Sequence, residues 1–400
     1  MEKKSILQKG KGRLRSRQKL TYLYEIDRLY FAQVSESIKD LAVKELEELG
    51  AENIEPVFRG IRFAASREVF YRVNYMSRLV SRVLAPLISF ECPDRDVLYK
   101  KARTIRWEEF MTPRSTFSVY ANVSDSEITH SQYAALRVKD AIADYFRDRT
   151  NKRPNVDGQD PDVGINLHIR NNEAHISIDA SGAPLHKRGY REETIAAPMQ
   201  ETVAAAIIQY TGWDGTTPLY DPMCGSGTLL AEALMAYCRI PAGIFRKRFG
   251  FERLPDFDAG LFERVKSEAE KQIRPLPEHL ICGSDQSEQS VDVARTNLMG
   301  IHHGGDVDIQ CSDFKRLDSL PPGVIVTNPP YGIRLEKGKD LKSFYKSLGD
   351  FLKQRCKGSS AYIYFGEPEY IRHVGLKASW KKPLKMGGLD GRLAKYDMYG

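Results

Sequence analysis

The stretch LYDPMCGSGTLLAEAL (219–234) decides the fold of the C-terminal half of this chain. A short apolar strand ends at Asp221, and a glycine-rich turn leads into an apolar helix that starts near Thr228. Glycines let the backbone approach a ligand closely, and the free amides of a helix N-terminus attract anions. The turn lacks the third glycine of the dinucleotide fingerprint and the Gly-Lys-Ser/Thr of a Walker loop. A bare Gly-x-Gly would indicate an ordinary turn, but this motif is long enough to be specific.

Strands and helices alternate around this turn from residue 198 to the C-terminus. Helical spacing covers 198–212, 228–238, 287–300 and 341–356, and apolar strand patterns cover 218–223, 279–285, 321–331 and 360–366. Repeated strand–helix units predict an α/β fold with a largely parallel, doubly wound sheet. A closing hairpin around 387–391 adds antiparallel strands, so we expect the sheet to be mixed.

Two further polar motifs follow strands of this expected sheet. Asp285 ends the strand 279–285, where an acidic residue typically accepts the hydroxyls of a ribose. Asp313 and Phe314 follow the short strand 307–311, and an acidic acceptor beside an aromatic ring suits an adenine. Taken alone, Asp285 would be a helix N-cap and the second pair a surface turn. Their spacing to the glycine turn favours a ligand site.

The stretch VIVTNPPYGIRL (324–335) indicates the reaction class. A hydrophobic strand ends at Asn328 and is followed by Pro329, Pro330 and Tyr331. The prolines fix φ and remove amide donors, so rigid carbonyl acceptors remain beside the Asn328 side chain and an aromatic face. This set suits a planar amino group, whose delocalised lone pair makes it a poor nucleophile. Holding both of its hydrogens and aligning it with a methyl donor addresses that by positioning and electrostatics.

The N-terminal half has a different pattern. Residues 22–34 are β-rich and aromatic, 38–50 have helical spacing, 54–65 alternate as a strand pair, and 67–84 return to a helical period. This β-α-β-α order predicts a small ferredoxin-like α+β unit. Helices over 94–111 and 131–150, a strand over 116–123 and a hairpin over 165–179 follow. We expect the main domain boundary near residue 190.

Together, the motifs of the C-terminal half resemble class I S-adenosylmethionine-dependent methyltransferases that act on planar amines. The segments LHKRGYR (185–191), APMQETVAAAII (197–208), DPMCGSGT (221–228), NPPYG (328–332) and GLDGRLAKYDM (388–398) extend the resemblance. They are similar to the THUMP-containing guanine-N2 methyltransferases of 23S ribosomal RNA, whose homologues are often labelled N6-adenine-specific DNA methylases. The similarity is strong over 180–335 and extends to the N-terminal half only as a pattern.

The resemblance implies a domain order and a reaction. It implies a basic flexible arm over 1–21, a ferredoxin-like α+β domain over 22–90, a THUMP RNA-binding domain over 91–185 and a Rossmann-like methyltransferase domain with a mixed seven-stranded sheet over 186–400. S-adenosyl-L-methionine would donate a methyl group to the N2 amine of a guanine in 23S rRNA or in a large-subunit assembly intermediate. Some longer family members fuse a second methyltransferase, whereas this sequence stops at Gly400, so we expect one modification.

The same resemblance assigns residues to roles. The donor would be bound by Asp221, Pro222, Cys224, Gly225, Ser226, Gly227, Thr228, Asp285, Asp313 and Phe314. The catalytic set would be Asn328, Pro329, Pro330 and Tyr331. Lys187, Arg188 and Arg191 would grip RNA phosphates near the catalytic mouth, since Lys and Arg dominate backbone contacts. Without the resemblance, a solvated linker is the better interpretation of these three residues.

The net charge is unevenly distributed. The chain holds 60 Lys and Arg against 53 Asp and Glu, a net charge of +7. Residues 1–20 contribute eight basic residues and one acidic residue, so residues 21–400 carry 52 of each and sum to zero. The whole excess therefore lies in the N-terminal arm, which we interpret as a non-specific RNA tether.

The sequence favours a cytoplasmic protein without metal or membrane. None of the six cysteines forms a CxxC pair, and scattered cysteines are typical of a reducing compartment. No apolar run approaches the ~18 residues of a membrane span, and the basic N-terminus lacks the apolar core of a secretory signal. The pair His302 and His303 lacks metal-ligand spacing and is interpreted as a surface loop.

Three alternatives stay open at this point. An N6-adenine methyltransferase of DNA or RNA would use the same Asn-Pro-Pro-Tyr chemistry, and only the N-terminal half argues against a DNA substrate. A glutamine methyltransferase of translation factors also holds a planar amide with this motif, but needs neither a basic arm nor a THUMP-like half. A non-catalytic RNA-binding factor would be expected to have lost part of the donor site.

Overall fold

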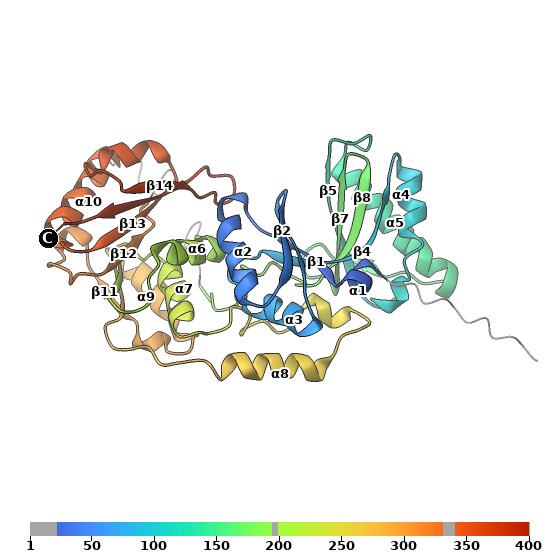
Figure 1. Cartoon of the computed structure of the whole chain (residues 1–400), viewed down its shortest axis with the longest axis horizontal. Coiled ribbons are helices and arrows are strands. Elements are labelled where there is room, and N and C mark those ends of the chain that lie inside the picture. The colour runs from blue at the N-terminus through green and yellow to red at the C-terminus, as the bar shows by residue number, and fades with distance from the viewer. Residues whose placement is uncertain (1–21, 194–198, 331–340, 400) are drawn as a thin grey trace, which may run out of the picture.

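A computed structural model describes residues 22–193, 199–330 and 341–399. The described strands form two sheets in an elongated molecule (Figure 1). The N-terminal sheet has eight strands in the order β2-β3-β1-β4-β8-β7-β5-β6. The C-terminal sheet has seven, in the order β11-β10-β9-β12-β13-β15-β14.

The N-terminal half builds its sheet from segments between residues 29 and 179. Its strands are β1 (Leu29–Gln33), β2 (Glu52–Val57), β3 (Gly60–Ala64), β4 (Arg82–Glu91), β5 (Thr116–Ser124), β6 (Asn155–Val156), β7 (Val163–Arg170) and β8 (Glu173–Asp179). Its helices are α1 (Leu23–Asp27), α2 (Lys39–Glu48), α3 (Arg67–Met76), α4 (Arg95–Ala102) and α5 (Ser131–Thr150).

The C-terminal half contains the helix–strand alternation that its sequence pattern predicts. Its strands are β9 (Leu219–Asp221), β10 (Ile281–Asp285), β11 (Asp308–Cys311), β12 (Val324–Thr327), β13 (Ser360–Phe365), β14 (Trp380–Pro383) and β15 (Arg392–Asp397). Its α-helices are α6 (Glu201–Thr211), α7 (Thr228–Tyr237), α8 (Ala259–Glu270), α9 (Glu288–Met299) and α10 (Leu341–Arg355). Strands β9 to β13 pair in parallel, and β15 pairs antiparallel with β13 and β14.

Strand β4 joins the two predicted N-terminal units into one sheet. It pairs with β1 of the first unit through Phe31↔Leu84 and with β8 of the second from Leu84↔Asp179 to Glu91↔Glu173. Its first residues, Arg82 to Leu84, pair with β1, and the rest of this ten-residue strand pairs with β8. The ferredoxin-like and THUMP segments are therefore continuous in hydrogen bonding, which their sequence patterns did not indicate.

Three N-terminal segments differ from the sequence prediction. The helix expected over 94–111 ends at Ala102, and a separate 3-10 helix follows at Trp107–Glu109. Residues 22–34 begin with α1 rather than with a strand, because the Glu25 carboxylate accepts a hydrogen bond from the Tyr22 amide at the helix start. The helix expected over 67–84 ends at Met76. The buried Glu45 carboxylate accepts hydrogen bonds from Ser77 Oγ and from the amides that follow it, so these groups no longer continue the helix.

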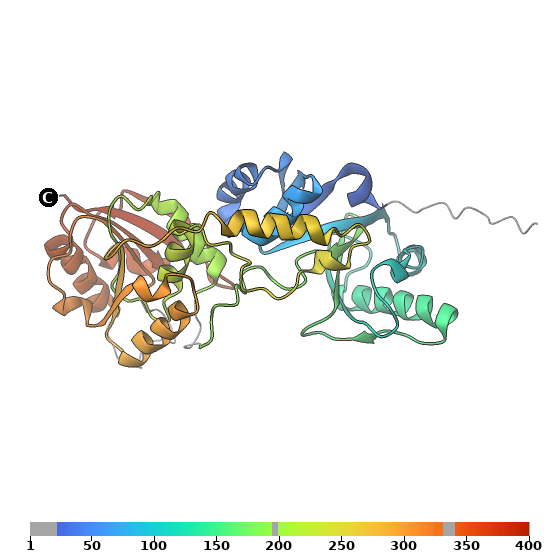
Figure 2. The ribbon, with the colours of Figure 1, turned by 90° about the horizontal axis from the view of Figure 1, so that it is seen from below.

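The segment between α7 and β10 crosses from the C-terminal half to the N-terminal one. Its helix α8 lies along α3 in both ribbon views (Figures 1 and 2). Tyr75 Oη donates to Glu270 at 2.6 Å, the Asp258 amide donates to Tyr71 Oη at 2.9 Å, and Arg67 pairs with Asp256 at 3.2 Å. No element was predicted here, because this segment belongs to neither repeating pattern.

The C-terminal sheet is covered on both faces, as a parallel sheet requires. Ile325 and Ile363 pack in one apolar cluster with Tyr345 and Leu348 of α10. The alternate residues, such as Val326 and Tyr362, belong to the other cluster with α6 and α7. Within the described residues, every helix is too short or too polar to cross a membrane.

Candidate active site

The carboxyl ends of β9, β10, β11 and β12 lie at one edge of the C-terminal sheet. Their parallel registers place Gly283 beside Asp221 and Asp285 beside Cys311. Strand β9 lies between β10 and β12, so the chain order reverses there. Ligands of open α/β sheets bind at such a switch point, outside the carboxyl ends of the strands. The polar motifs of the sequence therefore meet at the expected ligand edge.

The glycine turn adopts a conformation that only glycine takes easily. Gly225 and Gly227 have φ values of 55° and 79°. The Gly225 amide donates to Asp285 Oδ2 at 3.0 Å, which ties the turn to the end of β10. Helix α7 then begins at Thr228 without a side-chain cap on its N-terminal amides. This end of α7 offers amide donors and a positive helix dipole to an anionic group.

Asp221 is a buried carboxylate at the end of β9. It is only 1% exposed, and burial, helped by the nearby charge of Asp285, raises its pKa to about 7. Its Oδ1 accepts a hydrogen bond from the Met223 amide at 3.1 Å. A carboxyl group held in this way gains most from a cationic partner, which would restore its charged form.

Strand β10 packs closely against α7 at Gly283, beneath the glycine turn. A Cβ added at Gly283 would come within 2.6 Å of Leu230 Cδ1 of α7 and 3.3 Å of the Asp221 carbonyl oxygen. A side chain there would have to displace the end of the Leu230 side chain and would crowd the Asp221 carbonyl. Gly283 was not singled out in the sequence, because its neighbours become visible only when β10 packs beneath α7.

Asp313 and Phe314 lie at the same edge but are used partly for structure. Asp313 Oδ1 accepts a hydrogen bond from the Lys315 amide and caps the short 3-10 helix that follows β11. Phe314 is 4% exposed, and its ring packs edge-to-face against Phe344 and Phe351 at 5.7 and 5.6 Å between centroids. The structure therefore places Phe314 beside the site but uses its ring as core packing, not as the open stacking face expected from the sequence.

Asn328 follows β12 and carries an unsatisfied acceptor. Its Oδ1 is buried and has no hydrogen-bond partner among the described residues. Leaving a buried acceptor unpaired costs about 1–3 kcal/mol, so such atoms in native proteins call for a functional or structural explanation. Pro329 and Pro330 follow it, whereas Tyr331 lies outside the described residues.

The structure corrects the role predicted for Arg188. Its side chain is fully buried and binds Glu232 of α7 through Nε at 3.1 Å. Its other nitrogens donate to the carbonyls of Leu185 and Arg78 at 2.8 and 2.6 Å. A guanidinium with no exposed surface cannot grip an RNA phosphate, so Arg188 instead locks the linker onto α7.

The two neighbouring cations have different surroundings. Arg191 points at the donor site, where its Nη2 donates to Thr228 Oγ1 at 3.2 Å and pairs with Glu201 at 2.8 Å. It is therefore turned toward the start of α7 and not toward an RNA surface. Lys187 is exposed and stays a candidate phosphate contact.

Sequence reasoning missed two buried polar residues that position the site. The amide of Asn297, on α9, donates to the carbonyls of Ser226 and Glu193 at 3.2 Å and so connects the glycine turn to the linker. Glu232 holds Arg188 from the middle of α7. An acidic residue within the apolar run TLLAEALMAY was a readable signal of a buried partner.

Family models match three consecutive parts of the chain. The model of the RMKL-like methyltransferase domain matches residues 188–395. The THUMP domain model matches 92–179, and the model of the RlmL ferredoxin-like domain matches 30–84.

Curated relatives cover nearly all of the chain. The Synechocystis protein named "Putative RNA methyltransferase slr0064" is 38% identical over 375 residues, which cover 93% of this chain and 97% of that protein. The "Ribosomal RNA large subunit methyltransferase K/L" of Syntrophotalea carbinolica is 37% identical over 380 residues, covering 92% of this chain and 53% of that protein. The chain thus spans about half the length of the K/L relatives it matches.

Two solved structures share the architecture over more than nine-tenths of the chain. "SMU.472, a putative methyltransferase complexed with SAH" has a TM-score of 0.81 at 27% identity and covers 93% of this chain and 98% of that one. A "predicted N6-adenine-specific DNA methylase" from Listeria monocytogenes has a TM-score of 0.81 at 25% identity, covering 92% and 96%. These matches confirm the predicted methyltransferase fold. The chain therefore belongs to the RMKL-like methyltransferase family and carries ferredoxin-like and THUMP domains ahead of its methyltransferase domain.

Proposed function

We propose that this protein transfers a methyl group from S-adenosyl-L-methionine to the exocyclic N2 amine of a guanine in 23S rRNA. The observation that carries the proposal is the buried Oδ1 of Asn328 at the carboxyl end of β12, which has no hydrogen-bond partner among residues 22–193, 199–330 and 341–399. An amine hydrogen of the target base would satisfy this acceptor. The two prolines that follow cannot donate to it, because they have no amide hydrogen.

The donor site fits the amino-acid and ribose ends of S-adenosylmethionine. When bound, this cofactor supplies an electrophilic methyl group. The uncapped start of α7 and the charge of Arg191 favour its carboxylate, and Asp221 favours its cationic amine. Asp285 lies at the strand end where ribose hydroxyls are accepted. The SAH complex of SMU.472, with a TM-score of 0.81, supports this fit.

Asn328 would act by holding the target amine in one orientation. Accepting a hydrogen bond from one N–H directs the nitrogen lone pair toward the donor methyl group and favours the positive charge that develops on nitrogen. A base inside a helix cannot reach this edge, so the nucleotide must leave its stack. The proton released after transfer can pass to solvent.

RNA is favoured over DNA by the N-terminal half. The chain carries a THUMP domain, and relatives 36–38% identical to it are named as RNA or ribosomal RNA methyltransferases. The Listeria structure, at 25% identity, is named as an N6-adenine DNA methylase, so methylation of adenine N6 is the alternative that the experiment must distinguish. A ribosomal substrate would place the enzyme in the cytoplasm.

The test is methyl transfer from labelled S-adenosylmethionine to rRNA from a strain that lacks the gene. Parallel reactions offer DNA from the same strain and purified translation release factors, and products are separated as nucleosides or peptides. We expect label in N2-methylguanosine of 23S rRNA. Label in N6-methyladenosine, in DNA only or in a glutamine side chain would contradict the guanine assignment and identify which alternative holds.

A further inference from the structure

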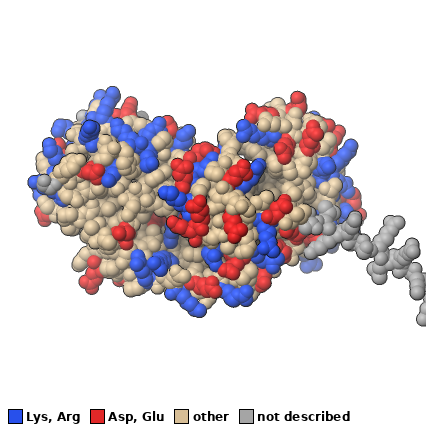
Figure 3. Space-filling view, in the orientation of Figure 1, with Lys and Arg blue, Asp and Glu red and all other residues tan. Residues whose placement is uncertain are grey.

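The charge of the folded body is strongly divided, although its total is zero. Residues 341–385 hold ten Lys and Arg against three Asp and Glu, a net charge of +7, and all ten basic residues are exposed. Residues 21–330 hold 37 basic and 45 acidic residues, a net charge of −8. Figure 3 shows Lys and Arg gathered at the upper left, where Figure 1 places α10 and β14.

Helix α10 carries a row of lysines on its outer side. Lys342, Lys346 and Lys353 are exposed and separated by four and seven residues, so they lie on one side of the helix. Lys357 continues the row just past the helix end. The opposite side, which includes Tyr345, Leu348 and Phe351, is buried against the sheet. The row from Lys342 to Lys353 is about 16 Å long.

Two neighbouring segments extend the row. Arg372 is exposed on the 3-10 helix Pro368–His373, which packs on α10 through the stacked rings of Tyr345 and Tyr370 at 5.2 Å. Lys381 pairs with Ala394, which is buried on the α10 side of the sheet. We call this surface the α10 face, and it comprises Lys342, Lys346, Lys353, Lys357, Arg372 and Lys381.

The α10 face reaches the edge where Asn328 lies. Helix α10 connects β12 to β13, which are parallel, so it must run back from the carboxyl edge of the sheet. Its first residues, including Lys342 and Lys346, therefore lie at the carboxyl edge. Lys353 and Lys357 lie progressively further from it. The row thus leads from the catalytic edge outward along the lobe.

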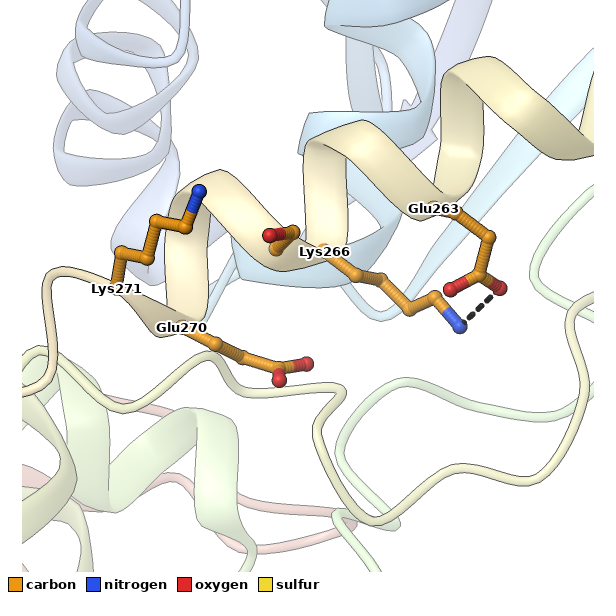
Figure 4. A pocket seen from close by; sticks show the side chains of 5 residues that line it. Glu263, Lys266, Glu270 and Lys271 are labelled. Atoms are coloured by element: carbon orange, nitrogen blue, oxygen red, sulfur yellow. Dashed lines mark ion pairs between the residues drawn. The ribbon is translucent and has the colours of Figure 1, made fainter.

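A second exposed helix shows how an ordinary charged surface differs. Around the pocket on α8, Lys266 pairs with Glu263 at 2.6 Å, and Glu270 and Lys271 adjoin them (Figure 4). Opposite charges alternate there and largely cancel. On the α10 row the one acidic residue is Asp350, which pairs with Lys346 at 3.1 Å.

We infer that the α10 face binds the phosphate backbone of the RNA substrate and holds it against the catalytic edge. This inference rests on the RNA substrate proposed above. A duplex places a phosphate about every 1.7 Å along its axis, so a row of about 16 Å spans several phosphates. A membrane surface fits less well. The apolar side of α10 is buried in the protein, and no large hydrophobic residue of 341–385 is exposed for insertion.

The test is the salt dependence of binding to total rRNA. The variant Lys346→Gln, Lys353→Gln, Lys357→Gln is compared with wild type over a range of salt concentrations, with folding checked by circular dichroism. Removing one phosphate contact should make the slope of log Kobs against log salt shallower by about 0.7–0.9, so we expect a decrease of about 2–3 for the triple variant. Arginine at the same three positions should restore the slope, because it keeps the charge.

The matched control removes three positive charges from α8 and the residue just after it, as Arg264→Gln, Lys266→Gln, Lys271→Gln. It should leave the slope within experimental error of wild type. An unchanged slope in the α10 variant, or an equal decrease in the α8 control, would overturn the inference. The inference would also be overturned, in favour of a membrane, if wild type bound anionic vesicles and the α10 variant lost that binding but kept its rRNA binding. The methylated nucleoside formed by wild type is identified in parallel. A product other than N2-methylguanosine would contradict the proposed reaction, whereas an unchanged salt slope would contradict the proposed RNA-binding surface.

Discussion

The two sheets of this protein carry polar residues in opposite ways. In the C-terminal sheet, helices cover both faces and the polar motifs are concentrated at one edge, where Asp221, Asp285 and Asn328 end parallel strands. The N-terminal sheet is mostly antiparallel. On its strand β7, buried Leu167 and Ile169 alternate with the more exposed His168 and Arg170. Its polar residues are therefore spread across a face.

The difference indicates how each half works. An edge built by strand ends brings a few groups into one fixed geometry, which is what bond-making chemistry requires. A broad polar face provides many weak contacts, which suits binding a long polymer. Single substitutions should therefore change activity or stability strongly at the carboxyl edge of the C-terminal sheet and at the buried contacts that connect it to the rest of the molecule. Elsewhere, their effects should be smaller and graded.

The largest expected effect is at the seam between the two halves. Arg188→Ala leaves Glu232 buried without its partner, which should lower the free energy of unfolding by about 3–5 kcal/mol. Urea denaturation measures it. The double variant Arg188→Met, Glu232→Leu should recover much of the loss, because neither charge of this pair is left buried without the other. Arg137→Ala, which breaks the exposed pair with Asp96, is the control and should cost no more than about 1 kcal/mol. Equal losses of unfolding free energy in Arg188→Ala and Arg137→Ala would show that burial gives the Arg188–Glu232 pair no extra weight.

The next effect separates catalysis from binding. Asn328→Ala removes the acceptor proposed for the target amine, and we expect kcat to fall about 10²–10³-fold, as for loss of one preorganised hydrogen bond elsewhere. Donor affinity, measured by calorimetry, should stay near that of wild type. Asn166→Ala, on the N-terminal sheet, is the matched control and should leave kcat unchanged. Full activity in the Asn328 variant would disprove the proposed amine contact.

A smaller effect tests the electrostatic contrast between the sheets. Burial raises the pKa of Asp221 to about 7, so between about pH 4 and 7 the folded protein holds a proton that the unfolded chain releases. Its contribution to stability is complete below that range and declines as pH rises, by at most about 1.4 kcal/mol per pH unit. Urea denaturation of wild type and Asp221→Asn across this range should show their difference declining with pH.

Asp162, beside the N-terminal sheet, should show the opposite sign. The Thr116 amide donates to its carboxylate and lowers its pKa, so its contribution is present at neutral pH and is lost as pH falls below the ordinary range of an aspartate. The difference between wild type and Asp162→Asn should therefore shrink on acidification. If the stability differences of Asp221→Asn and Asp162→Asn from wild type changed with pH in the same direction, the predicted opposite signs would be wrong.

The smallest effect concerns the N-terminal arm, which lies outside the described residues. Deleting residues 2–20 removes eight basic residues and one acidic residue. We expect weaker rRNA binding at low salt, a shallower salt slope, and little difference at high salt, because the contacts would be purely electrostatic. Filter binding over a salt series measures this, and an identical slope would show that the arm does not touch RNA.

Local patterns predicted much of the fold, and they failed at long-range contacts. The strand–turn–helix of 219–234 was readable because glycine geometry and apolar periodicity are local properties. The end of α3 at Met76 was not, because the Glu45 carboxylate that binds the next amides lies about thirty residues away. The crossing of α8 to α3 was also invisible, since its ion pair joins Arg67 to Asp256.

The candidate site divides in the same way. Asp221, Asp285 and Asn328 could be named from sequence because parallel strands place their carboxyl ends at one edge. Arg188 could not be assigned correctly. A basic residue in a polar linker looks solvated until the fold shows Glu232 beside it. The zero net charge of residues 21–400 likewise gave no indication of the cationic α10 face, because a net charge does not say where the charges lie.

The sequence by itself determined the methyltransferase architecture and the sheet edge at which its polar motifs meet, because strand order and motif spacing follow from local propensities and chain connectivity. Only the tertiary structure decided which charges are buried and which form a surface. Burial depends on contacts between residues far apart in the chain, as in the pairing of Arg188 with Glu232 and the packing of α10 that turns its lysines outward.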